Sequence, residues 1–312
     1  MLMKRTIYLL SLVILLTAYS KNATAQYYFY NDEYYDSPVL FEVGGSIGAM
    51  NCLTDLGGKK GIGKKFVKDL NTGYTSLTGG VFFSATYRNA IGLRLEAAFG
   101  KLSADDKVLD EVDIADIAKA RYNRNLSFRS TITEFSLVAE LHPLYIFINY
   151  ENRDTDPPRT SPYLLAGVGY YSFNPQTQTK AGKWVDLQPL STEGQGFKEY
   201  PDREVYKLKQ LNIPLGVGIK YELSSILNLR GEYVYRVLQT DYLDDLSTTY
   251  VDPAVYQTYF TGPKLANALE LNNRQINPIT TAGGKRGSAK QNDSYFSFNL
   301  KLSLTIGREK IR

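Results

Sequence analysis

The segment 294–308, SYFSFNLKLSLTIGR, alternates between apolar and polar side chains at every second position. Its apolar positions are Phe296, Phe298, Leu300, Leu302, Leu304 and Ile306. An α-helix would spread these side chains around its circumference, whereas a β-strand places all of them on one face. A strand that crosses a membrane needs about 9–11 residues, and this segment is long enough. The pattern therefore predicts a membrane-spanning β-strand.

Seven further segments show a similar alternation, namely 39–50, 76–88, 91–100, 131–141, 163–173, 210–221 and 227–236. The segment 163–173 is rich in Gly and Tyr, so its two faces are less distinct than those of the others. Alternation alone is also typical of a soluble β-sandwich, in which the polar face of each strand meets water. The connections between the segments decide between these two interpretations.

The predicted strands are joined alternately by short and long connections. About two residues, Asn89-Ala90, link the second strand to the third, and a few residues around Ser224-Ser225 link the sixth to the seventh. The links after the first, third, fifth and seventh strands are long, which is uncommon in a compact soluble domain. Short turns at one end and long loops at the other are the signature of an outer-membrane barrel. We therefore predict an all-β fold, a transmembrane antiparallel up-and-down β-barrel of eight strands with long extracellular loops and short periplasmic turns.

The link between the fourth and fifth strands, roughly 143–162, is the exception among the short turns. We interpret it as a longer periplasmic turn. Its YIFINY run leaves open an extension of the strand or a different strand count. An even number of strands would place both ends of the mature barrel on the periplasmic side.

The beginning of the chain has the pattern of an export signal. Lys4 and Arg5 precede an apolar run over 7–18, and Ala23-Thr24-Ala25 matches the small-residue pattern at which signal peptidase cleaves. The apolar run is shorter than the roughly 20 residues that a membrane-spanning helix needs. We therefore expect a signal peptide over 1–25, a Tyr-rich segment over 26–37, a barrel over 38–307, a periplasmic tail over 308–312, and residence in the cell outer membrane.

An eight-stranded barrel is just wide enough to be filled by its own side chains. The phrases GLRLE at 92–96 and NLRGE at 228–232 each follow a short turn, so their charged residues should lie at similar depth. The predicted lumen charge network consists of Arg94, Glu96, Glu134, Glu140, Arg230 and Glu232. We interpret this network as structural filling of the lumen, in preference to a proton or ion path.

The long loops carry three patterns that bear on binding. GGKKGIGKK at 57–65 lacks the spacing of a nucleotide-binding loop, and its lysines are better suited to lipopolysaccharide phosphates or an acidic partner. The acidic stretch 104–124 is expected to hold a short helix. The last long loop opens with the motif Thr240, Asp241, Tyr242, Leu243, Asp244 and Asp245. Together with Asp252, its carboxylates could bind calcium, although Asp-rich turns are more often simply solvated.

Enzymatic and cofactor chemistry has little support in the sequence. Cys52 is the single cysteine and His142 the single histidine, which excludes an internal disulfide and the usual cysteine or histidine metal clusters. We expect His142 in the periplasmic girdle, far from the outer loops. The net charge is +4 with no basic block, so no nucleic-acid partner is indicated. The prediction is a protein that is not an enzyme, with no cofactor and no metal.

Three stretches resemble a known family of membrane proteins. QLNIPLGVGIKYEL at 210–223, LRGEYVYRVLQTDYLDDLSTTYVD at 229–252 and NCLTDLGG at 51–58 are similar to segments of Bacteroidota outer-membrane barrels, a family that includes the type IX secretion protein PorG. The resemblance implies an outer-membrane barrel from that phylum. The function expected is that of an anchor or docking component of an envelope assembly, with type IX protein secretion as one candidate. Its partners would be outer-membrane lipid and lipopolysaccharide, and periplasmic or outer-membrane lipoproteins of a secretion complex. The alternative is a surface-exposed binding or adhesion barrel whose long loops contact an extracellular ligand.

Overall fold

The computed structural model describes residues 34–57, 72–110, 118–147 and 158–310. The predicted signal peptide and the lysine-rich run of the first loop lie outside the described residues. Asp36–Arg308 form one compact unit. The strands and loops described below lie in this unit, apart from Tyr34, Tyr35, Glu309 and Lys310 at the ends of the first and last strands.

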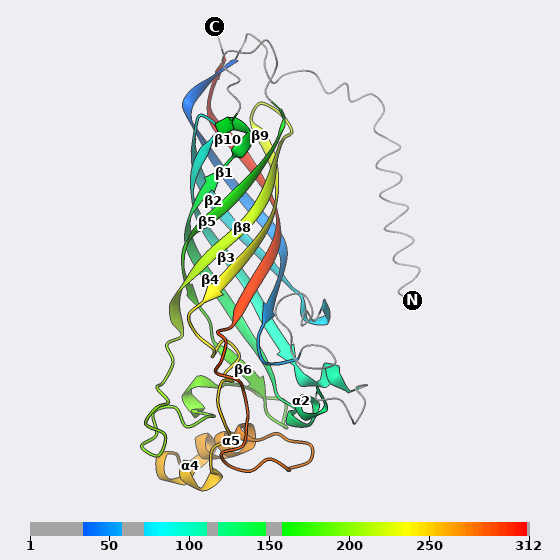
Figure 1. Ribbon diagram of the computed structural model, residues 1–312, viewed down its shortest axis with the longest axis vertical. Coiled ribbons are helices and arrows are strands. Elements are labelled where there is room, and N and C mark those ends of the chain that lie inside the picture. Colours follow the sequence, from blue (N-terminus) through cyan, green and yellow to red (C-terminus); the bar gives the residue numbers. More distant parts are fainter. Residues whose placement is uncertain (1–33, 58–71, 111–117, 148–157, 311–312) are drawn as a thin grey trace. The chain divides into compact units, whose positions relative to one another are not determined.

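Within the described residues, eight long antiparallel strands form a closed ring (Figure 1). They are β1 (Tyr34–Leu53), β2 (Ser76–Tyr87), β3 (Ile91–Asp105), β4 (Ser127–Leu141), β5 (Thr160–Ser172), β8 (Lys209–Glu222), β9 (Leu227–Leu238) and β10 (Ser294–Lys310). Each strand pairs with its neighbour in the chain order of these eight, and β1 lies beside β10, which leaves no edge unpaired. The predicted eight-stranded barrel is confirmed.

The alternation of the sequence separates the outside of the barrel from the inside. Along β2 and β3, apolar side chains such as Leu77, Val81 and Leu95 expose more than half of their surface, at 73%, 61% and 59%. The residues between them point inward, and Arg94 is only 1% exposed. An apolar exterior around a closed ring is the surface that a lipid bilayer requires. Among the described residues, no helix is both long and apolar enough to cross a membrane.

The periplasmic connections from β2 to β3 and from β8 to β9 are short, as predicted, although the first has three residues instead of about two. Residues 88–90 join β2 to β3, and Arg88 and Asn89 both adopt left-handed backbone angles, with φ of 49° and 56°. Consecutive left-handed residues give a tight turn whose twist suits the flanking strands. The YIFINY run is not a strand extension in its described part, because α3 (Pro143–Phe147) is a short helix.

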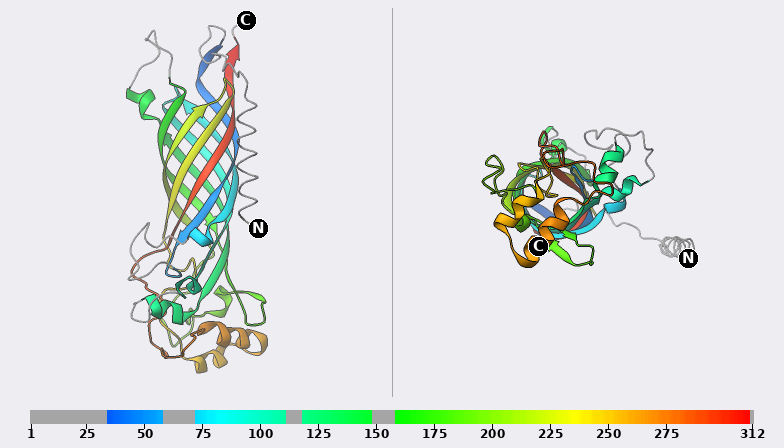
Figure 2. Two further views of the ribbon diagram at one scale, coloured as in Figure 1. Left: turned by 90° about the vertical axis from the view of Figure 1, so that its right-hand side faces the viewer. Right: turned by 90° about the horizontal axis from the view of Figure 1, so that it is seen from below.

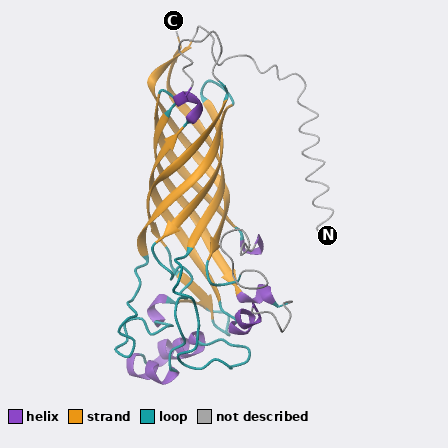
Figure 3. Ribbon diagram, in the orientation of Figure 1, coloured by secondary structure: helices purple, strands orange, loops and turns teal. Residues whose placement is uncertain are grey.

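Most of the remaining structure lies at the opposite end of the barrel, where the long loops emerge (Figures 1 and 3). Its elements are η2 (Thr72–Tyr74), η3 (Asp106–Leu109), α2 (Ala118–Arg124), β6 (Pro175–Gln178), β7 (Trp184–Asp186), η4 (Gln188–Leu190), α4 (Pro253–Tyr259) and α5 (Gly262–Asn272). The helix predicted within 104–124 is confirmed by α2. Seen from this end, α4 and α5 lie in front of part of the barrel ring (Figure 2).

Candidate functional site

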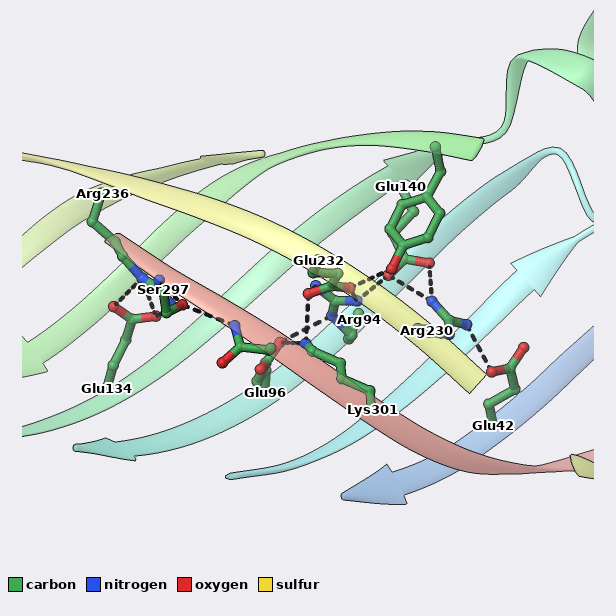
Figure 4. A network of polar contacts seen from close by, with 12 residues as sticks. Glu42, Arg94, Glu96, Glu134, Glu140, Arg230, Glu232, Arg236, Ser297 and Lys301 are labelled. Atoms are coloured by element: carbon green, nitrogen blue, oxygen red, sulfur yellow. Dashed lines mark hydrogen bonds and ion pairs between the residues drawn. The ribbon is translucent and has the colours of Figure 1, made fainter. Parts of the chain in front are cut away.

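At the centre of the lumen, the guanidinium group of Arg94 lies between carboxylates from three strands (Figure 4). Arg94 on β3 donates to Glu140 on β4 and to Glu232 on β9. Its Nε lies 3.1 Å from Oε2 of Glu96, two residues along its own strand. Because strand residues two apart share a face, the sequence phrase that carries Arg94 and Glu96 delivers both charges to the lumen.

A second arginine extends this network toward the periplasmic end. Arg230 on β9 is fully buried and donates to Glu140 Oε2 at 2.9 Å and to Glu42 Oε2 at 2.7 Å. Glu42 also accepts from Lys220 Nζ at 2.6 Å. Glu140 therefore bridges the two arginines, and cations and carboxylates alternate along the lumen. This alternation offsets the cost of burying each charge.

Two further side chains complete the network. Lys301 Nζ on β10 lies 2.5 Å from Glu96 Oε2 and 2.8 Å from Glu232 Oε2. The ring of Phe82 lies among the cations, 5.1 Å from Lys301 Nζ and between 5.6 and 5.7 Å from the guanidinium carbons of both arginines. An aromatic face attracts cations within about 6 Å, so Phe82 adds to the neutralisation of the buried positive charge.

Glu134 belongs to a separate cluster nearer the long loops. It accepts from Arg236 Nε at 3.2 Å, from Asn212 Nδ2 at 2.8 Å and from the Tyr295 hydroxyl. Arg236 also donates to Ser297 Oγ at 2.6 Å. The structure therefore brings five of the six predicted lumen residues into one network and places the sixth in this neighbouring one.

Two tyrosines of the lumen were missed by sequence reasoning. Tyr163 on β5 donates to Glu232 Oε1 at 2.5 Å, and Tyr295 on β10 contacts Glu134. The sequence did not indicate Tyr163 as a lumen residue, because its Gly- and Tyr-rich strand shows no clear polar face. Tyr295 could have been found from its position, since it lies one residue before the outward-facing Phe296.

The periplasmic mouth of the lumen contains the single histidine. His142 is 2% exposed, its Nδ1 lies 2.9 Å from Ser161 Oγ, and its Nε2 lies 3.6 Å from Glu140 Oε2. The expectation that His142 lies in the periplasmic girdle on the outside of the barrel is therefore wrong, because its side chain is buried inside. The residue directly after β4 continues the inward parity of Glu140, which directs the imidazole into the barrel.

The long loops fold into a compact extracellular cap over 54–57, 72–75, 106–110, 118–126, 173–208 and 239–293. Its apolar core is continuous with side chains at the outer end of the lumen. Phe197 stacks on Tyr259 with ring centroids 4.1 Å apart, and Tyr206 stacks on Tyr242 at 4.9 Å. Leu243, Tyr256 and Ala268 have no exposed surface. Burial of this kind makes the cap a packed structure instead of a set of solvated loops.

A buried carboxylate ties the two longest loops of the cap together. Glu193 accepts from Thr248 N at 2.8 Å, from Ser247 N at 3.0 Å and from Arg286 Nη1 at 3.0 Å. Arg286 also donates to the carbonyl of Asp245 at 2.8 Å. The link joins the segment after β5 to both ends of the segment between β9 and β10, so it fixes their relative position.

The loop motif 240–245 is buried within the cap. Asp245 is 1% exposed and accepts from Thr192 Oγ1 at 2.5 Å and from the Tyr206 hydroxyl at 2.7 Å. Thr240, Asp241 and Asp244 are at most 9% exposed. The interpretation of this motif as a solvated turn is therefore wrong. No local pattern indicates its burial, because the covering residues come from a different loop.

Three carboxylates of the motif region interact unfavourably. The pKa of Asp244 lies well above its usual range. Burial is the largest cause, and the neighbouring carboxylates Asp55 and Asp241 add to it. The pKa of Asp293 is also raised well above its usual range, by burial and then by the carboxylates of Asp244 and Asp241. Burial raises the pKa of Asp241 to about 7. The described residues contain no group of three His, Cys, Asp or Glu side chains placed to hold a metal ion.

Replacement of Tyr206 with phenylalanine is expected to lower the stability of the cap by about 1–2 kcal/mol, because Asp245 Oδ1 loses its buried hydrogen bond. The ring stacking on Tyr242 remains. Protease protection of the cap in the folded barrel measures the effect. The matched control is Tyr242→Phe, which removes a hydroxyl from the other ring of the same stack. Equal protection of Tyr206→Phe and the wild type would contradict this role for Tyr206.

Comparison with known proteins finds a likeness in fold to solved outer-membrane barrels. No protein-family model and no curated protein matches the chain. Its fold is similar to the N-terminal β-barrel domain of Pseudomonas aeruginosa OprF, at 9% identity and a TM-score of 0.33, with 87% of this chain and 100% of that one covered. It is also similar to Neisserial surface protein A, at 7% and 0.35, covering 86% and 98%, and to the attachment invasion locus protein Ail of Yersinia pestis, at 8% and 0.33, covering 86% and 97%. The strand pairings of the chain itself establish the closed eight-stranded ring.

The fold and the site together define the class of protein. A closed antiparallel ring, an apolar exterior, short turns at one end and long loops at the other are the properties of an outer-membrane β-barrel. The chain is an eight-stranded outer-membrane β-barrel with an ion-paired lumen and a folded cap.

Proposed function

We propose that the protein is a non-enzymatic anchor or docking component of an envelope assembly. The observation that carries this proposal is the combination of an ion-paired lumen with a packed cap. Arg94, Arg230 and Lys301 each contact buried carboxylates, so the interior is committed to holding the barrel together. The features left for contact with other molecules are the two ends of the barrel and its outer surface.

The periplasmic end has an apolar feature suited to docking. The connection between β4 and β5 is the longest one on that side, and its helix α3 exposes Phe147 by 83% and Ile146 by 41%. Exposed apolar side chains at a membrane protein's aqueous end favour contact with a partner or with the membrane interface. A periplasmic or outer-membrane lipoprotein is the partner class that fits a docking role there.

The assembly proposed is an envelope secretion complex, with type IX secretion as one candidate. Support for this comes from the resemblance of 210–223 and 229–252 to the Bacteroidota barrels that include PorG. Part of that resemblance has a structural reason in this chain. The motif 240–245 packs into the cap instead of forming a free loop, so its sequence is constrained by folding.

A second candidate function is surface binding by the cap. The specific observation that favours it is the size and packing of the two longest loops, which bury a shared core that includes Phe197, Leu243 and Tyr256. A packed cap holds its outer surface in one conformation, and such preorganisation lowers the entropic cost of binding. An extracellular ligand or a host surface would then be the partner.

The test is purification of the tagged full-length protein from detergent-solubilised outer membranes, with mass spectrometry of the proteins recovered with it. Docking predicts stoichiometric recovery of envelope lipoproteins or of a secretion channel. Phe147→Ser should reduce that recovery, whereas Leu223→Ser, an exposed apolar residue on another periplasmic turn, serves as the matched control. Recovery of the barrel alone would contradict a stable complex. Loss of ligand binding on exchange of 253–272, with secretion intact, would favour the second candidate.

A further inference from the structure

The outer face of the barrel changes from apolar to cationic toward the long loops on three of the four consecutive strands β3, β4, β5 and β8. On β3, the outward series Leu93, Leu95, Ala97 and Phe99 is followed directly by Lys101. On β4, the outward series that contains Phe135 ends in Thr133, Thr131 and Arg129. On β8, Lys209 precedes Leu211 and lies opposite Ser172 of β5. Each cation is thus on the loop side of the apolar belt, where a bilayer places its polar headgroups.

Lys101 and Arg129 are close to one another in the sheet. Lys101 pairs with Thr131, and Arg129 pairs with Ser103, so the two cations are diagonal neighbours on adjacent strands. Diagonal neighbours on one face lie about 7–8 Å apart at Cα, within reach of long side chains. The exposed hydroxyl of Thr131 lies between them on the same face. One phosphate group could therefore contact two cations and a hydroxyl donor.

Arg129 is held in place by the cap. Its guanidinium carbon lies 3.3 Å from the centroid of the Trp184 ring, and its Nε donates to Gln176 Oε1 at 3.2 Å. Gln176 and Trp184 belong to β6 and β7, which continue the sheet beside the outer end of β4. Trp184 remains 39% exposed. Tryptophan is enriched at the boundary between hydrocarbon and headgroups, so the Arg129–Trp184 pair is suited to that depth.

The cations have no acidic partner among the ion pairs of the described residues. The nearby Asp186 of β7 accepts instead from Gln176 Nε2 at 2.6 Å and from Asn174 Nδ2 at 3.0 Å. The positions of the same parity at this level on the other half of the barrel are uncharged, namely Asn51 on β1, Thr75 before β2, Gln239 after β9 and Ser294 on β10. Among the positions at this level that the structure describes, the positive charge therefore lies on the side of the perimeter formed by β3, β4 and β8.

We propose that Lys101, Arg129 and Lys209 form a binding surface for the phosphate groups of a glycolipid in the outer leaflet. The lipid's acyl chains would lie against the apolar side chains below, which include Phe99, Phe135 and Tyr170. Charge complementarity and the position at the edge of the apolar belt select a phosphorylated lipid over a neutral one. This surface is independent of the proposed docking function, because it faces the membrane.

The single tryptophan of the chain provides a direct reporter. The full-length protein in detergent micelles is titrated with diphosphoryl lipid A while the emission of Trp184 is followed, and lipid A without phosphates and inorganic phosphate are titrated in parallel. We expect a saturable emission change with the diphosphorylated lipid, weakened at high ionic strength. An equal response to the dephosphorylated lipid would overturn the proposal. A response to inorganic phosphate at the same concentration would assign the site to free phosphate and overturn the lipid assignment.

Substitutions of single lysines test which residues contact the lipid phosphates. Lys101→Gln and Lys209→Gln are each expected to weaken lipid binding about fivefold, the effect of one cation near an anionic surface. Both side chains are exposed, so folding should be retained, and the heat-dependent shift in gel mobility checks this. Lys198→Gln, on the exposed cap surface, is the matched control and should bind like the wild type. Native mass spectrometry counts bound lipid without relying on Trp184. Unchanged binding by the Lys101→Gln, Lys209→Gln double variant would refute the site.

Discussion

Replacement of Arg230 with methionine is expected to lower the free energy of unfolding of the barrel by about 3–5 kcal/mol, or to prevent its insertion. Arg230 donates to Glu42 and Glu140 and has no exposed surface. Methionine fills a similar volume but leaves two buried carboxylates, Glu42 and Glu140, each short of a cation. Breaking a buried pair by removing one partner costs more than the pair itself contributes, because the remaining charge stays buried.

Guanidinium titration of the barrel in lipid vesicles, followed by circular dichroism, measures this effect. Arg88→Met is the matched control, because Arg88 lies exposed at the tight turn between β2 and β3. Its loss should change stability by less than about 0.5 kcal/mol. A cost for Arg230→Met as small as that of the control would show that the lumen network does not carry the stability of the barrel.

The barrel was predictable because membrane strands obey a simple local rule. Every second residue must be apolar, and parity then assigns the residues between them to the lumen. This rule is sufficient to place one connected set of charges inside the barrel, namely Arg94, Glu96, Glu140, Arg230 and Glu232. The alternation rule does not determine which lumen side chains form ion pairs with one another. Strand tilt and stagger decide that Glu134 pairs with Arg236 in a neighbouring cluster.

The cap was not predictable by the same rule. Its contacts join residues far apart in the chain, such as Thr192 with Asp245 and Glu193 with Arg286. No periodicity records these pairs, and the Asp-rich composition of the motif indicated solvated residues. Inside the cap, Asp244 Oδ1 accepts from Leu246 N, and Asp293 Oδ2, from the far end of the same loop, accepts from Leu243 N.

Replacement of Asp244 with asparagine is expected to stabilise the cap and to flatten its dependence on pH. Burial and the neighbouring carboxylates hold the pKa values of Asp244 and Asp293 well above the usual range, and burial raises the pKa of Asp241 to about 7. In an opened cap these groups would ionise near the ordinary value of 3.8. Between these values the opened state releases protons that the closed state retains, so the stability of the closed cap falls as pH rises from about 4 to 7 and above.

Hydrogen exchange of cap amides, corrected for intrinsic rates, should therefore show more protection at pH 5 than at pH 7.5. Asparagine keeps the oxygen that accepts from Leu246 N and replaces the unpaired Oδ2 of Asp244 with a donor that faces carboxylates. We expect about tenfold greater protection at pH 7.5 for Asp244→Asn, which corresponds to one pKa unit of relieved repulsion. Arg124 is ion-paired with Asp106, and its attraction lowers the pKa of Asp244 by less than burial and Asp55 raise it. The exposed Asp202→Asn should change nothing. Two results would contradict this prediction. One is hydrogen-exchange protection that rises with pH, and the other is the same pH dependence of protection in Asp244→Asn as in the wild type. Either would mean that these carboxylates are ionised and compensated in the closed cap.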